Sequence, residues 1–193
     1  EIPEPPRMLA GSITPNIAEV LSAINTPARE VILSANKKIA FLSISEGSVQ
    51  IVDISDITQP AILSSVDAYP SLFTALVLSK DGNFLFAGCL EKFEVIDITN
   101  YRSPQIVASL TFPRDIPEDE YAKATMDISA DGKTIYLASE GIAILDVSNV
   151  TSPKLISLSS VSDRLVLRLS PEKHILFVAG KTLEIYNVSD PHS

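Results

Sequence analysis

One short phrase occurs four times in this chain, and it limits the fold more than any other feature. The four copies are VQIVDISDITQP, FEVIDITNYRSP, IAILDVSNVTSP and LEIYNVSD, at residues 49–60, 93–104, 142–153 and 183–190. Each copy is apolar on both alternating sets of positions, which is typical of a β-strand covered on both faces. A polar anchor residue follows, and with the Ser or Thr two positions later it predicts a turn closed by side-chain hydrogen bonds. The anchors are Asp53, Asp97, Asp146 and Asn187.

A second pattern precedes each copy of the phrase. Short stretches with period-two alternation end at a serine, and the turn segments SANK, SKDGN, SADGK and SPEKH begin at those serines. Two of the turns contain the Asp-Gly pair that β-hairpins favour. An aromatic residue stands seven positions after each serine, and we expect this aromatic column to fill the core of each unit. The serines are Ser34, Ser79, Ser129 and Ser170, and the aromatics are Phe41, Phe86, Tyr136 and Phe177.

Each unit therefore predicts four strands, which is the content of a β-propeller blade. We expect an all-β fold: one propeller domain over residues 1–193, with repeats at about 28–66, 73–110, 124–159 and 164–193. The last repeat ends before its fourth strand, and PRMLAG near the N-terminus matches the missing strand position by position. Residues 6–13 are thus predicted to complete the fourth blade and close a four-bladed ring, which also removes exposed sheet edges. The alternative is half of an eight-bladed ring.

The phrases QIVDISDITQP, EVIDITNYRSP and ILDVSNVTSPKLISL resemble LVIVD-type repeats, and the hairpins SKDGNFLFAG and SADGKTIYLAS are similar to those of YVTN and lactonase-like propellers. The resemblance covers nearly the whole chain and implies the propeller fold. It also implies an exported or cell-surface location, because LVIVD-type repeats are often found in such proteins. It carries no catalytic motif onto particular residues.

Two segments depart from the repeat. The apolar residues of TPNIAEVLSAINTPAR, residues 14–29, follow helical spacing and predict a short amphipathic helix lying on one face of the ring. The acidic segment TFPRDIPEDEYAK, residues 111–123, and VDAYPSLF, residues 66–73, both join an outermost strand to the next innermost strand. They therefore predict one binding patch of aromatic and acidic side chains on a single face. The patch comprises Tyr69, Pro70, Phe73, Asp115, Glu118, Asp119 and Tyr121.

Catalytic and metal-binding signals are sparse. The chain has two histidines, one cysteine and neither a GxSxG nor an HExxH motif, so no catalytic residue is assigned. Lone Cys89 excludes an intrachain disulfide and a thiolate zinc site. The loop following each aromatic carries a charged residue: Glu46, Glu91, Glu140 or Lys181. We interpret these as turn residues. Neighbouring copies would lie about one blade apart, which is too far to share a cation. No metal or cofactor is predicted.

The net charge and the absence of long apolar runs limit the classes of partner that the chain can bind. A net charge of −9 without a basic cluster argues against nucleic acid, and no apolar run approaches the roughly 20 residues of a membrane helix. We therefore predict a non-catalytic scaffold that binds a protein or a small ligand through one loop face. The alternative is a lactonase-like hydrolase with its site at the central channel. A monomer is favoured because intramolecular pairing has the higher effective concentration, with a homodimer formed by exchange of the terminal strands as the alternative.

Overall fold

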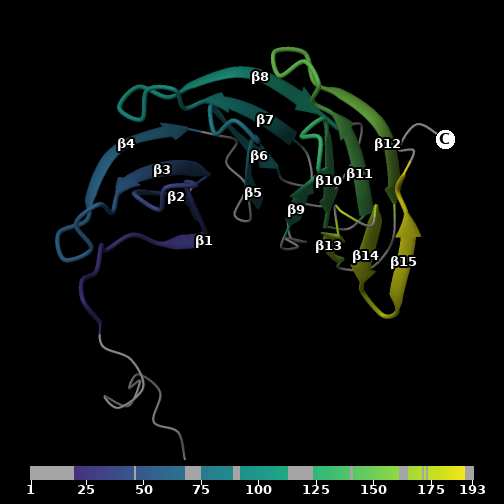
Figure 1. Cartoon of the computed structure of the whole chain (residues 1–193), viewed down its shortest axis with the longest axis horizontal. Helices are drawn as coiled ribbons and strands as arrows, with labels where there is room; N and C mark the ends of the chain where they lie inside the picture. Colours follow the sequence, from purple (N-terminus) through teal and green to yellow (C-terminus); the bar gives the residue numbers. More distant parts are fainter. Residues whose placement is uncertain are drawn as a thin grey trace, which may run out of the picture.

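Antiparallel β-sheets built from consecutive strands make up the fold in the computed structural model (Figure 1). The structure describes residues 20–45, 47–67, 75–88, 92–112, 124–139, 141–160, 165–170, 172 and 174–189. Fifteen strands in these ranges form four sheets, one for each repeat. The predicted all-β propeller architecture is confirmed at this level.

The first two sheets each have four strands. Blade 1 contains β1 (Ala28–Leu33), β2 (Ile39–Ile44), β3 (Ser48–Asp53) and β4 (Ala61–Asp67). Blade 2 contains β5 (Ala75–Leu78), β6 (Phe84–Gly88), β7 (Lys92–Asp97) and β8 (Gln105–Thr111).

Blade 3 repeats this order, and blade 4 has three strands among the described residues. Blade 3 contains β9 (Thr125–Ile128), β10 (Thr134–Ala138), β11 (Gly141–Asp146) and β12 (Lys154–Ser160). Blade 4 contains β13 (Val166–Ser170), β14 (Ile175–Ala179) and β15 (Leu183–Asn187). In all four blades the order in space is the order along the chain, so each strand is joined to its neighbour by a turn.

The repeat extends to backbone irregularities. The ladder between the third and fourth strands shifts register at the same place in blades 1, 2 and 3, between Ile51 and Val52, Val95 and Ile96, and Ile144 and Leu145. In the first hairpin turn of blades 2 and 3, Gly82 and Gly132 adopt positive φ, a conformation that glycine reaches without steric cost.

The apolar core lies in layers between neighbouring blades. This arrangement suits strands that are apolar on both faces, because a blade with a neighbour on each side has both faces covered. One layer joins blades 1 and 2 through Phe41 and Ile96, the next joins blades 2 and 3 through Phe93 and Leu145, and the third joins blades 3 and 4.

The blades follow an open arc. β5, β9 and β13 lie on the inside of the arc, β8 and β12 lie on its outside, and blades 1 and 4 stand at its opposite ends (Figure 1). Closure of a four-bladed ring is therefore not confirmed. The strand predicted at residues 6–13 lies outside the described residues.

The helix predicted over residues 14–29 is wrong in the part that the structure describes. Residues 20–27 contain no helix, and β1 begins at Ala28. Side chains in this region bond to blade 1 instead: Ser22 Oγ donates to the Ile57 carbonyl at 2.5 Å, and Thr26 Oγ1 donates to Gln50 Oε1 at 3.0 Å. Pro27, which has no amide hydrogen to donate, also disfavours a helix interior here. Val20 is 75% exposed, so it covers no core.

Candidate functional site

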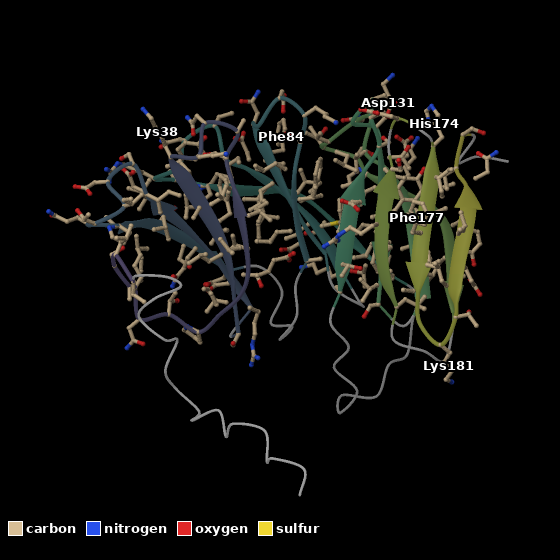
Figure 2. The ribbon with its side chains drawn as sticks, turned by 60° about the horizontal axis from the view of Figure 1, so that its bottom comes forward. Lys38, Phe84, Asp131, His174, Phe177 and Lys181 are labelled. Atoms are coloured by element: carbon tan, nitrogen blue, oxygen red, sulfur yellow. The ribbon has the colours of Figure 1, made fainter. Side chains whose placement is uncertain are left out.

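The arc has two edges. The turns between the first and second strands, marked by Lys38, Asp131 and His174, lie on one edge, and Lys181 lies on the opposite edge (Figure 2). We call the first the turn edge and the second the loop edge. The fourth strands of blades 1 and 2 end at the loop edge, because Asp67 pairs with Ser48 and Thr111 pairs with Lys92 at the beginnings of the third strands.

Carboxylates on the turn edge are engaged by their own turns. In the hairpin of blade 2, Asp81 Oδ1 accepts hydrogen bonds from Ser79 Oγ at 2.6 Å and from the Asn83 amide at 3.1 Å. These bonds stabilise the charged form, and with the Ser79 bond as the largest cause they lower the pKa of Asp81. In blade 3, Asp131 Oδ1 accepts from Ser129 Oγ at 2.6 Å, and this bond is the largest cause of the lowered pKa of Asp131.

The four anchors of the repeated phrase close turns in the same way. Each of them accepts a hydrogen bond at its side-chain Oδ1 from the amide two residues later, at 2.9 or 3.0 Å. The prediction that these residues form turns is confirmed. The donors are the amides of Ser55, Thr99, Ser148 and Ser189.

The aromatic column is buried in three of the four blades, which confirms its structural role there. Phe41, Phe86 and Tyr136 are each at most 1% exposed. Phe86 stacks on Phe93, with ring centroids 5.8 Å apart and an interplanar angle of 18°. Phe177, in blade 4, is only half-buried.

Polar side chains on the innermost strands connect neighbouring blades. Glu30 Oε2 accepts a hydrogen bond from the Leu76 amide at 2.8 Å, which joins β1 to β5. On β9, Thr125 Oγ1 accepts from the Leu167 amide at 2.9 Å and Asp127 Oδ2 accepts from the Leu169 amide at 2.8 Å, which join β9 to β13. Sequence reasoning missed Asp127. A carboxylate in an otherwise apolar alternating stretch was the signal that could have identified it.

A buried polar pair lies between blades 1 and 2. Glu94 is 3% exposed; its Oε1 lies 2.6 Å from Lys92 Nζ and accepts from Ser109 Oγ at 3.3 Å. Its second oxygen, Oε2, is buried without a hydrogen-bond partner among the described residues, as is Ser43 Oγ. Sequence reasoning missed this pair, because Glu94 lies inside an apolar phrase and the equivalent position in blade 3 is Ala143.

The predicted binding patch cannot be placed. Its seven residues, Tyr69, Pro70, Phe73, Asp115, Glu118, Asp119 and Tyr121, all lie outside the described residues, as do Glu46, Glu91 and Glu140. Phe112, at the start of the acidic segment, is 4% exposed and packs into the core between blades 2 and 3. The described portions of the chain contain no group of three or more His, Cys, Asp or Glu residues placed to hold a metal ion. They also contain no helix with the length and apolar character needed to cross a bilayer.

Comparison with protein families agrees with the repeat geometry. The LVIVD repeat model matches residues 32–68 and 122–159, which include most of blades 1 and 3. Two segments of the chain thus match the LVIVD repeat model. A search of the curated proteins found no significant match.

Solved structures similar to this chain include one named as a β-propeller domain. A protein from Lactobacillus plantarum has a TM-score of 0.70 at 18% identity, covering 88% of this chain and 56% of that one. The periplasmic gluconolactonase PpgL of Pseudomonas aeruginosa has a TM-score of 0.66 at 16% identity, covering 85% and 50%. The β-propeller domain of Cps50 (Swd1) from Myceliophteria thermophila has a TM-score of 0.61 at 14% identity, covering 82% and 53%. The chain thus spans about half the length of the structures it matches, and the likeness shows the fold alone.

Proposed function

We propose that this chain is a non-catalytic propeller scaffold that binds a protein or a small ligand through its loop edge. The observation that carries the proposal is the difference between the two edges. On the turn edge, the recurring carboxylates are engaged by their own turns, as in the bonds to Asp81 and Asp131. The segments that depart from the repeat begin at the loop edge, at the ends of β4 and β8.

The binding patch is proposed to combine aromatic and acidic side chains from two of these connecting segments. Tyr69, Pro70 and Phe73 come from the segment that joins blades 1 and 2. Asp115, Glu118, Asp119 and Tyr121 come from the segment that joins blades 2 and 3. Aromatic side chains supply buried contact area, and carboxylates favour a partner that presents positive charge.

Site-specific photo-crosslinking in the native host tests this proposal. A photoreactive amino acid replaces Tyr121 in the patch or, as the matched control, Lys38 on the turn edge. We expect a discrete crosslinked species from position 121 that disappears when Asp115, Glu118 and Asp119 are changed together to Ala. Equal crosslinking from both positions, or no effect of the triple substitution, contradicts the proposal.

A second candidate function is a lactonase-like hydrolase acting at the inner strands. It is supported by the structural likeness to a protein named as a gluconolactonase and by Asp127 and Arg168 on the innermost strands β9 and β13. The Asp127 carboxylate already binds the Leu169 amide, which favours a role in joining blades. We therefore expect no hydrolysis of glucono-δ-lactone above the buffer rate. Hydrolysis that is lost in Asp127→Asn establishes the enzyme instead.

We also propose that residues 6–13 supply an outer strand for blade 4. The support is the match of PRMLAG to the strands led by Pro60, Pro104 and Pro153, together with the edge position of β15 among the described strands. Hydrogen exchange tests it: amides 8–11 are expected to exchange slowly, and deletion of residues 1–12 is expected to cause aggregation through the open edge. Fast exchange at these amides overturns the assignment.

A further inference from the structure

Blade 1 exposes an apolar residue that every other blade buries. Val31 stands three positions before the serine that begins the first hairpin turn, and it is 58% exposed. The equivalent residues in the other blades face the preceding blade and are at most 6% exposed: Leu76 3%, Met126 6% and Leu167 0%. Blade 1 therefore has the face that receives a preceding blade, and no blade among the described residues covers it.

Blade 4 exposes the complementary face. Leu183 and Ile185 on β15 are 65% and 61% exposed. Their equivalents in blade 1, Val49 and Ile51, are fully buried against blade 2. Phe177 lies on this same face, because it pairs with Ile185 across the sheet. The two open faces lie at opposite ends of the arc (Figure 1).

The joint between blades 1 and 2 shows how such faces fit together. Phe41, Val49 and Ile51 on one side pack with Leu76 and Ile96 on the other. By the repeat, the first set corresponds to Phe177, Leu183 and Ile185 at one end of the arc. The second set corresponds to Val31 and Val52 at the other end, where Val31 is 58% exposed and Val52 is 2% exposed. The end faces therefore match each other, whereas neither matches a second copy of itself.

We propose that two copies of this chain join head to tail, with blade 4 of each copy packed on blade 1 of the other, to close a ring of eight blades. Such a pairing forms two identical joints related by a two-fold axis and leaves no end face open. The geometry is that of the joints already present within the arc. The size of the similar structures also agrees, because 88% of this chain superposes on only 56% of the Lactobacillus plantarum protein. This inference does not depend on the loop edge and stands apart from the proposed binding function.

Mass measurement on the intact 193-residue chain tests the proposal. Light scattering coupled to size exclusion at micromolar concentration is expected to give about 42 kDa, twice the 20.8 kDa of one chain. Val31→Asp and Ile185→Asp each place a charge in both joints and are expected to give folded monomers. Ile57→Asp is the matched control, because Ile57 is 57% exposed but belongs to the turn between β3 and β4. It is expected to remain a dimer.

Mixing the two monomeric variants distinguishes head-to-tail from like-to-like association. In a mixture of Val31→Asp with Ile185→Asp, blade 4 of the first and blade 1 of the second are both unaltered, so one joint re-forms. We expect a dimer of about 42 kDa to reappear on mixing. Circular dichroism identical to that of the unaltered chain shows that each variant is folded.

Three results overturn the proposal. A mass of one chain for the unaltered protein leaves the end faces to some other partner, including further blades of a longer polypeptide. A dimer that survives Val31→Asp and is lost in Ile185→Asp shows blade 4 paired with itself. Failure of the mixed variants to associate shows that the two faces do not recognise each other.

Discussion

The aromatic column gives the sharpest quantitative prediction, for Phe86→Ala. Phe86 is 1% exposed, stacks on Phe93 and belongs to the core layer between blades 2 and 3. Truncation of a buried Phe removes its transfer free energy and leaves a cavity, which together cost about 3–5 kcal/mol. Loss of the stacked pair adds to this, since such pairs contribute about 0.5–1.5 kcal/mol beyond burial. We therefore expect the upper part of the range, about 4–5 kcal/mol.

Phe177→Ala is the matched control, because Phe177 has the same place in the repeat but is only half-buried in blade 4. Both substitutions are made in the monomeric Val31→Asp background, so that association does not bury Phe177. Urea unfolding followed by circular dichroism gives the two free energies of unfolding. We expect the Phe177 loss to be smaller than the Phe86 loss, because less of the Phe177 side chain is buried and the loss scales with buried area. A Phe86 loss below about 1 kcal/mol refutes the assignment of the column to the core.

Two further predictions concern charged groups. The pKa values of Asp81 and Asp131 are lowered in the folded chain, chiefly by the Ser79 and Ser129 hydroxyls. The stability that these carboxylates contribute is therefore present above their unfolded pKa, near 3.8. It is lost as the pH falls through their lower folded pKa values. The urea midpoint should therefore fall less between pH 5 and pH 3 in the double variant Asp81→Asn/Asp131→Asn than in the unaltered chain. An equal fall in the two proteins contradicts this. At the buried pair, Lys92→Met should lower the free energy of unfolding by about 1–3 kcal/mol, because it leaves the Glu94 carboxylate without its cation. The double variant Lys92→Met/Glu94→Met should recover most of that loss in urea unfolding. A double variant no more stable than Lys92→Met shows that the loss does not come from the unpaired charge.

Local structure followed from the sequence wherever the repeat was intact. Alternation of apolar residues identified the strands, and the anchor-led turns form the predicted side-chain hydrogen bonds. Within the described residues 20–29, the predicted helix is wrong because helical spacing describes only the apolar residues. The segment also holds Pro27, and its polar side chains, such as Ser22, bond to blade 1. The spacing of apolar residues does not predict such hydrogen bonds between polar side chains and a neighbouring blade.

Ring closure and the site were harder to predict, for separate physical reasons. The angle between blades depends on how residues such as Leu137 and Gly88 pack across a joint. The Leu137 side chain lies close to the Gly88 backbone, and a Cβ at Gly88 would stand 3.2 Å from Leu137 Cδ1. A pattern of apolar positions does not fix that angle. The burial of Glu94 was not predicted, because a single carboxylate in an apolar strand is normally expected to face solvent. The structure shows that Lys92 and Ser109 bind its Oε1 atom inside the protein. The binding patch remains a prediction.

The open arc itself is tested most directly by two distances measured with spin labels. Lys38, Lys133 and His174 each stand four positions after the serine that begins the first hairpin turn of their blade. Labels at Lys133 and His174 report on adjacent blades, and labels at Lys38 and His174 report on the two ends of the arc (Figure 2). Pulsed electron double resonance is carried out on the monomeric Val31→Asp chain with Cys89 replaced by Ser. The open arc predicts a much longer distance for Lys38 and His174 than for Lys133 and His174. Two equal distances contradict it, because in a closed four-bladed ring blade 4 is as close to blade 1 as it is to blade 3.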